Sequence, residues 1–148
     1  MAQAPSVTRR GEITFHHITP GDTVKLAVLA GPATGSPTTV VLEVWEPGGA
    51  QPPNSHPEST ETFVVLAGQA TAHSDGDAVR IGAGDTLTLM PGSVHRIVND
   101  SPTERLYTLT IMQADGGFAE MITRGPRAEL DQRDLAVLGG VLPAAGLS

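Results

Sequence analysis

Two histidines and one glutamate are spaced so that a single β-rich domain could bring their side chains together: His56, Glu61 and His95. Two imidazoles and one carboxylate form the facial ligand set of non-haem iron sites, which leaves coordination positions for substrate and dioxygen. A lone histidine is more often a structural residue, because a metal site needs several convergent ligands. Three such residues together predict a metal site.

The residues that follow Glu61 form an apolar run that is typical of a buried strand. Alternate residues of a strand share a face, so Phe63 and Val65 point the same way as Glu61. A carboxylate among apolar groups needs a cation or hydrogen-bond partners to remain charged, and a metal ion would supply the cation. The structural alternative is that Glu61 pairs with an arginine and the two histidines cap loops.

The segments around these residues resemble the two sequence motifs of the cupin superfamily, over roughly residues 40–113. The first motif is met by His56, four residues, Glu61, six residues and Gly68. The second motif is met by Gly84, Gly92, His95 and Asn99, with Met90 where the family usually has proline. Asn54 stands where the first motif usually has its first histidine. In the family pattern, Asn99 stabilises a turn.

This resemblance implies one divalent metal ion inside a barrel, bound by His56, Glu61 and His95, with Fe(II) favoured and Mn, Ni or Zn as alternatives. Asn54 takes the place of a fourth ligand. An amide oxygen is a weaker donor than imidazole, so we expect Asn54 to line the same cavity as a distant ligand or as a hydrogen-bond acceptor for bound water. Glu58 has the strand parity of His56 and is the alternative to Asn54.

Three functions are consistent with such a site. An oxygenase-like metalloenzyme for a small enolic, phenolic or polyketide-like substrate is the leading hypothesis, because Fe(II) with open positions binds substrate and dioxygen side by side. A non-redox isomerase or cyclase would use the metal as a Lewis acid. A non-catalytic small-molecule-binding barrel stays open, since fold does not fix function. Flat substrates would stack on Phe63, Trp45 or Tyr107.

The chain contains 17 glycines and 12 prolines that separate short apolar runs, a rhythm typical of an all-β sandwich or barrel. We predict an all-β fold, a double-stranded β-helix or jelly-roll barrel, with a short C-terminal helix over residues 129–138. The expected strands are residues 12–15, 23–30, 38–46, 62–67, 69–74, 77–81, 86–90, 94–98 and 106–113, with 118–123 as one more candidate.

A length of 148 residues fits one domain. We expect a flexible N-terminal arm over residues 1–11, the barrel over 12–123 and a C-terminal extension over 124–148. A net charge of −7 argues against nucleic-acid binding. No apolar run has the length of a membrane span, and the chain contains no cysteine for disulfides or thiolate ligands. A cytoplasmic location is expected.

A homodimer is also expected. Sheets of this class have exposed edges that must be covered, and two-fold dimers are the commonest assembly. Edge pairing through the N-terminal strand over residues 12–15 would provide one interface. The apolar tail over residues 141–148 would pack at or near it.

Overall fold

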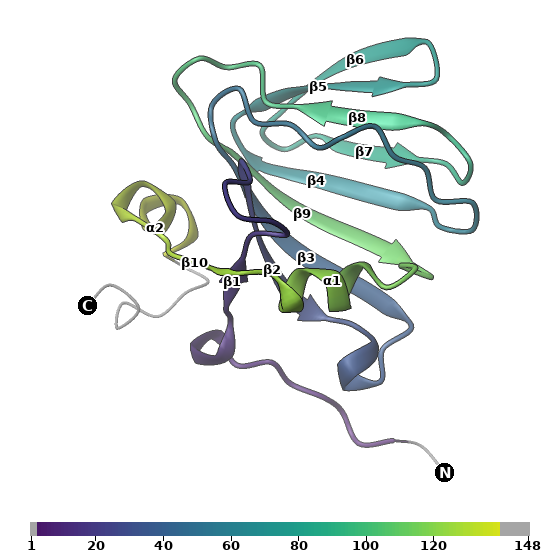
Figure 1. Ribbon diagram of the computed structural model, residues 1–148, viewed down its shortest axis with the longest axis vertical. Helices are drawn as coiled ribbons and strands as arrows, with labels where there is room; N and C mark the ends of the chain where they lie inside the picture. Colours follow the sequence, from purple (N-terminus) through teal and green to yellow (C-terminus); the bar gives the residue numbers. More distant parts are fainter. Residues whose placement is uncertain (1–2, 140–148) are drawn as a thin grey trace.

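The computed structural model describes residues 3–139, and two antiparallel sheets form the framework of this part of the chain (Figure 1). The elements are η1 (Arg10–Glu12), β1 (Phe15–His16), β2 (Val24–Ala30), η2 (Pro32–Thr34), β3 (Thr38–Trp45), β4 (Glu61–Ala67), β5 (Gln69–Ser74), β6 (Asp77–Gly82), β7 (Thr86–Leu89), β8 (His95–Val98), β9 (Leu106–Gln113), α1 (Phe118–Arg124), β10 (Arg127–Ala128) and α2 (Gln132–Leu138).

The larger sheet has the strand order β10-β1-β2-β3-β9-β4-β7, and the smaller sheet has the order β6-β5-β8. Inward side chains of both sheets pack into one apolar cluster, which contains Val41 and Trp45 of β3, Phe63 of β4, Ala72 of β5 and Ile97 of β8. The core therefore lies between the two sheets. The all-β jelly-roll class predicted from the sequence is confirmed, and it carries two short helices near the C-terminus.

The outer face of the larger sheet is also covered. Leu42 and Val44 alternate with the inward residues of β3 and pack with Leu138 of α2 in a second apolar cluster. Helix α1 instead contributes Ile122 to the cluster between the sheets. Because both faces of β3 are covered, seven of its eight residues carry apolar or threonine side chains. The one exception is Glu43.

The N-terminal strand predicted over residues 12–15 is wrong in its bounds. The chain first makes the short helix η1, in which the Glu12 N–H donates to the Arg9 carbonyl at 2.8 Å. Strand β1 follows and pairs with β10 on one side and β2 on the other. The sheet edge is therefore formed by β10 of the same chain. The homodimer stays a prediction, and the tail assigned to its interface lies outside the described residues.

The strand suggested for residues 118–123 is a helix instead, α1. Asp115 explains the difference, because its carboxylate accepts hydrogen bonds from the N–H groups of Gly117 and Ala119 at the start of the helix, at 3.0 Å each. The buried residues Ala119 and Ile122 are three apart, which is a helical and not an alternating spacing. The apolar composition of this segment hid that periodicity.

The C-terminal helix predicted over residues 129–138 is present as α2, although it begins later than predicted, at Gln132, and ends at Leu138. Asp131 caps it by accepting from the Arg133 and Asp134 N–H groups. The fully buried Asp134 fastens the helix to the sheet: its carboxylate lies 3.0 Å from both Lys25 Nζ and an Arg105 guanidinium nitrogen. The Tyr107 hydroxyl donates to Asp134 at 3.0 Å. None of the helices within residues 3–139 has the length and apolar character needed to cross a membrane.

Candidate metal centre

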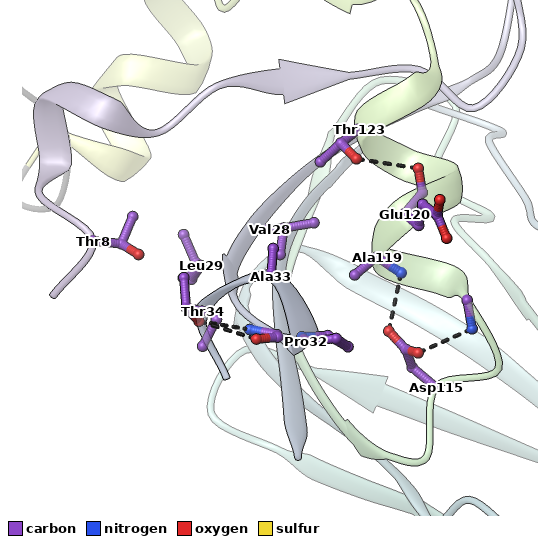
Figure 2. Close-up of a pocket in the computed structure, with 13 residues that line it drawn as sticks. Thr8, Val28, Leu29, Pro32, Ala33, Thr34, Asp115, Ala119, Glu120 and Thr123 are labelled. Carbon is purple, nitrogen blue, oxygen red and sulfur yellow. Dashed lines mark hydrogen bonds between the residues drawn. The ribbon is translucent and has the colours of Figure 1, made fainter. Parts of the chain in front are cut away.

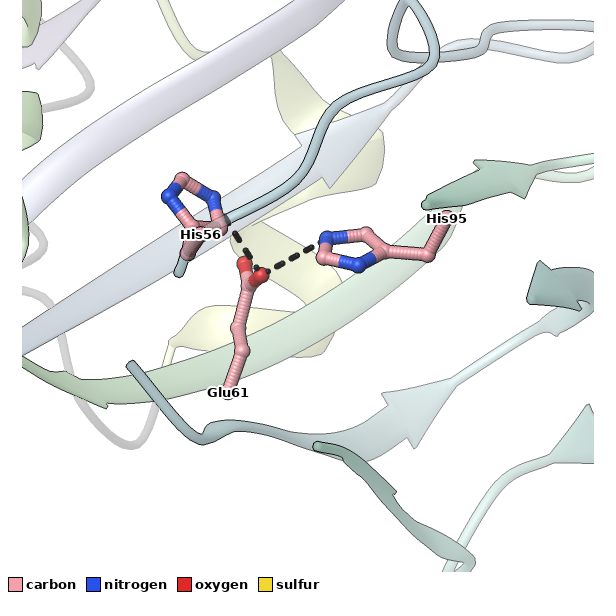
Figure 3. A group of neighbouring side chains, drawn as sticks. All are labelled: His56, Glu61 and His95. Atoms are coloured by element: carbon pink, nitrogen blue, oxygen red, sulfur yellow. Dashed lines mark ion pairs between the residues drawn. The ribbon is translucent and has the colours of Figure 1, made fainter. Parts of the chain in front are cut away.

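His56, Glu61 and His95 converge inside the barrel (Figure 3). Each offers one ligand atom, and these atoms all lie within 4.8 Å of one another. The Glu61 Oε2 atom is 3.0 Å from His95 Nε2 and 3.6 Å from His56 Nε2. The convergence predicted from the sequence spacing is confirmed. That the three residues hold a metal stays a prediction at this point.

The donor atoms fit a metal ion better than they fit each other. Glu61 Oε2 and His95 Nε2 are both buried and lie close together, yet neither has a hydrogen-bond partner of acceptable geometry among residues 3–139. Buried polar atoms are normally satisfied, so this pair of atoms lacks a partner that a cation would supply. Ligands bonded at about 2.0–2.2 Å lie at most about 4.4 Å apart, which small side-chain movements would reach.

Strand geometry places Glu61 and His95. Glu61 is the first residue of β4, and its side chain shares the inward face with the buried Phe63 and Val65. His95 is the first residue of β8 in the opposite sheet and is 3 % exposed. The two strands thus present their first residues to each other across the barrel. The apolar wall expected around Glu61 is present.

Backbone hydrogen bonds place His56, which lies in the loop between β3 and β4. Residues 49–56 run along β8 as an extra extended segment. Asn54 and His95 exchange N–H to carbonyl bonds of 3.0 and 2.8 Å, and the Gly92 N–H donates to the His56 carbonyl at 2.9 Å. Main-chain hydrogen bonds therefore hold this loop at both Asn54 and His56. Of the three converging residues, His56 has the most exposed side chain, at 26 %.

Ser93 orients the imidazole of His95. Its hydroxyl donates to the Met90 carbonyl at 2.9 Å and lies 3.4 Å from His95 Nδ1. Because the hydroxyl hydrogen is used, its oxygen is left to accept from Nδ1–H. This arrangement favours a proton on Nδ1 and a lone pair on Nε2 toward Glu61, which is the tautomer that would let Nε2 bind a metal.

Asn54 is paired with His95, one of the three converging residues. Directly opposed residues of an antiparallel pair have side chains on one face, with Cβ atoms about 4.5–5.5 Å apart, so Asn54 and His95 point to the same side. Its Nδ2 donates to the Pro52 carbonyl at 3.1 Å, whereas its buried Oδ1 has no partner. Whether this oxygen binds a metal stays a prediction. Glu58, the alternative, is exposed and lies outside the cluster.

The other motif residues have structural roles. Asn99 is fully buried, and its amide donates to the carbonyls of Trp45, Glu46 and Glu104, which confirms its assignment to a turn. Gly68 has a φ of +90°, and a Cβ atom there would lie 2.5 Å from the Arg105 carbonyl oxygen. Only glycine fits this turn after β4.

The aromatic residues divide between the two faces of the larger sheet. Trp45 and Phe63 lie in the cluster between the sheets, as a stacking role would require. Tyr107 does not, because it packs on the outer face with α2 and binds Asp134. Its assignment as a substrate-stacking residue is wrong, since it occupies the opposite strand parity on β9 from the inward-facing Thr108.

Glu43 is a site residue that the sequence reading missed. It lies on the inward face of β3, is 4 % exposed, and lines with Glu61 and Trp45 a small cavity of about 70 Å³. Burial raises the pKa of Glu43 to about 8; the neighbouring Thr110 opposes this rise and the charge of Glu61 adds to it. The sequence did contain a signal for this residue, which is a glutamate inside the apolar run VVLEVW. Glu43 is two residues from Trp45 and therefore shares its face of the strand, whereas the adjacent Leu42 points outward.

A larger hollow, of about 660 Å³, lies outside the barrel between β2, η2 and α1 (Figure 2). The Asp115 carboxylate lines this hollow, but its oxygens already accept hydrogen bonds from Gly117, Ala119 and Thr39. No cluster of metal-ligand side chains within residues 3–139 lies there. The candidate centre is therefore inside the barrel.

Residues 41–112 match the family model of the Cupin domain. This match spans both motif segments, from the middle of β3 to the end of β9. A comparison with curated protein sequences gives no match.

Solved structures with a similar fold come from several bacteria. A protein of Thermotoga maritima described as a predicted oxalate decarboxylase is 25% identical, with a TM-score of 0.64 over 73% of this chain and 98% of that one. KdgF from Halomonas sp. is 15% identical, with a TM-score of 0.63 over 74% and 94% of the two chains, which shows the fold alone. An uncharacterized double-stranded β-helix protein of Klebsiella pneumoniae is 25% identical, with a TM-score of 0.56 over 64% and 78%.

The raised pKa of Glu43 predicts how stability depends on pH. Between the ordinary value of 4.5 and the folded value of about 8, the folded protein keeps a proton that the unfolded chain releases, so stability falls as pH rises. We expect Glu43→Gln to remove this loss. Between pH 5 and pH 8, the free energy of unfolding of the variant should rise by about 2–4 kcal/mol relative to that of the wild type, at about 1.4 kcal/mol per pH unit.

Urea unfolding of chelator-treated protein at each pH measures this difference. The exposed Glu104→Gln is the control and should follow the wild type at every pH. Parallel stability curves for wild type and Glu43→Gln would contradict the assignment of a neutral Glu43.

Proposed function

We propose that this chain, which belongs to the cupin superfamily, binds one divalent metal ion in its barrel and is an oxygenase-like metalloenzyme for a small enolic, phenolic or polyketide-like substrate. The observation that carries the proposal is the unsatisfied pair of buried atoms, Glu61 Oε2 and His95 Nε2, 3.0 Å apart beside His56. A chain that used these residues only for folding would gain stability by pairing them properly.

The ligands would be His56 Nε2, Glu61 Oε2 and His95 Nε2, with Asn54 Oδ1 beside them. Fe(II) is the favoured ion, with Mn, Ni or Zn as alternatives. When bound, iron supplies the one-electron chemistry that dioxygen requires, whereas the other ions supply Lewis acidity. The protein positions the ligands through β4, β8 and the 49–56 segment, and Ser93 keeps the His95 proton on Nδ1.

The protein also determines how a substrate approaches. His95 and Glu61 side chains are 2 % and 5 % exposed, whereas that of His56 is 26 % exposed, so solvent reaches the site on the His56 side. On the inner side, Trp45, Leu26 and Glu43 line the small cavity next to Glu61. The cavity volume of about 70 Å³ would admit only a small group of a substrate.

A second candidate is a non-redox isomerase or cyclase, and Glu43 is the observation that favours it. Enolisation requires a group that gives and takes protons near neutral pH, and the pKa of Glu43 is raised by burial to about 8. Small carboxylates should be tested as well, because the Thermotoga maritima protein with the similar fold is described as a predicted oxalate decarboxylase.

The first test is metal binding. We expect one equivalent of Zn²⁺ or Mn²⁺ to bind to chelator-treated protein, measured by isothermal titration calorimetry. His95→Ala and Glu61→Gln should each weaken binding at least about 100-fold, because loss of a direct ligand should exceed the 10–100-fold effect of losing an outer partner. His73→Ala, an exposed histidine outside the cluster, is the matched control and should bind like the wild type. Equal affinity in all four proteins would refute the site.

The second test separates the two candidate reactions. Protein loaded anaerobically with Fe(II) is mixed with a panel of enolic and phenolic compounds, and oxygen uptake is followed with an electrode. The oxygenase proposal expects uptake that depends on substrate and is lost in His95→Ala. Uptake absent for every compound, together with deuterium exchange into an enolisable ketone by the Mn²⁺-loaded protein, would favour the isomerase.

A third test concerns Asn54. Its side chain lies on the same face as His95, and its Oδ1 is unpartnered. Imidazole is a better donor than an amide for most divalent transition metals, so Asn54→His should tighten Zn²⁺ binding by about tenfold or more in a competition titration with a chromophoric chelator. Unchanged or weaker binding, with the fold intact by circular dichroism, would contradict the placement of Asn54 beside the ion.

A further inference from the structure

Glu43 is a buried carboxyl that the proposed ligand set does not use. It occupies the middle of β3, on the inward face that it shares with Val41 and Trp45. Strand pairing places Leu26 of β2 and Thr108 of β9 directly beside it. An uncompensated carboxyl in such surroundings costs folding free energy. Packing of the core therefore gives no reason for a glutamate at this position.

No lysine or arginine in the described part of the chain compensates the Glu43 carboxyl. Among residues 3–139, no lysine or arginine forms an ion pair with it. Lys25 is adjacent to Leu26, the cross-strand neighbour of Glu43, but its side chain points to the outer face and binds Asp134 at 3.0 Å. The titratable groups that face Glu43 on the inner side are Glu61, with His56 and His95 beyond it, and Asp22 at the edge of the cavity. The residues that β2, β9 and α1 place on this side are uncharged: Val24, Leu26, Thr108, Thr110 and Phe118.

Glu43 and Glu61 line the same cavity, of about 70 Å³. This volume holds a group of a few heavy atoms. A small ligand bound next to Glu61 would therefore also meet the Glu43 carboxyl. Trp45, the only tryptophan of the chain, lines this cavity too, and its indole N–H donates to the Thr108 hydroxyl at 3.0 Å.

We propose that Glu43 is a ligand-binding residue that donates a hydrogen bond from its neutral carboxyl to an anionic oxygen, a carboxylate or an enolate, of a small ligand held at the metal centre. This assignment rests on the proposed function, because the metal ion would hold the ligand next to Glu61. A hydrogen bond to a charged acceptor is roughly twice as strong as a neutral one. Burial among apolar side chains, with no lysine or arginine partner within residues 3–139, favours the neutral state of Glu43.

The proposal makes Glu43 a determinant of ligand class. An ionised glutamate would repel an anion, whereas a protonated one would stabilise it by donating a hydrogen bond. Acetate and acetamide have nearly the same shape and differ in charge, so they separate these effects. Both are small enough for the cavity, and acetate carries the carboxylate oxygen that the proposal requires.

The experiment uses the full chain loaded with Zn²⁺, with the zinc content of every variant measured by equilibrium dialysis. The indole N–H of Trp45 gives one signal in a ¹H–¹⁵N spectrum, and its shift follows titration with acetate or acetamide at pH 6.5. Wild type should prefer acetate. Glu43→Leu, which has no donor, should weaken acetate binding about tenfold and leave acetamide binding within about twofold.

Glu43→Gln keeps a donor and should retain acetate binding within about threefold of the wild type, which a merely structural role of Glu43 would not explain. Glu104→Gln is the surface control. Acetate bound as tightly or more tightly by zinc-loaded Glu43→Leu overturns the assignment of Glu43 and leaves the metal site standing. Failure of the wild type to bind zinc overturns the proposed function, and the assignment of Glu43 falls with it.

Discussion

Within the described part of the chain, the interior of this barrel must hold carboxyl groups without lysine or arginine partners, and that constraint governs the rest of the structure. The two faces of the larger sheet differ sharply in this respect. On the outer face, the buried Asp134 is matched by Lys25, Arg105 and Tyr107 at 3.0 Å each. On the inner face, Glu43 and Glu61 meet no lysine or arginine within residues 3–139. The outer network can fasten a helix by itself, whereas the inner set is complete only with a cation, a proton or a ligand.

The inner set also depends on backbone interactions that a list of side chains does not reveal. His56 belongs to no strand, yet its carbonyl accepts from Gly92, and its neighbour Asn54 is paired with His95. The segment that carries the first motif and the loop that carries the second are therefore held together by main-chain hydrogen bonds. Main-chain pairing therefore fixes His56 relative to His95, whereas packing of the two sheets against each other brings both histidines to Glu61 of β4.

Much of this arrangement could be predicted from the sequence, for a physical reason. The two-residue period of strands gives the inward face of β4 once Glu61 is placed, and glycine-rich turns mark the strand ends, so β9 was predicted with its observed bounds. Parity alone did not show which face of β9 was inward, so Tyr107 was assigned to the wrong side. Helix α1 was missed because Asp115 caps it from outside the apolar run. Glu43 was missed although it lies two residues before Trp45, on the same face of β3.

Folding and ligand binding are coupled through the same buried groups. A neutral Glu43 weakens the folded state as pH rises toward about 8, because the unfolded chain gains stability by releasing the proton. An ion that bound only the folded protein would add stability with the logarithm of its concentration over the dissociation constant, and it would do so by satisfying Glu61 Oε2 and His95 Nε2. A small anion would then satisfy the hydrogen of Glu43. The residues that cost the barrel stability are thus the ones that would form the proposed binding site, which is the expected trade-off when polar groups stand in an apolar core.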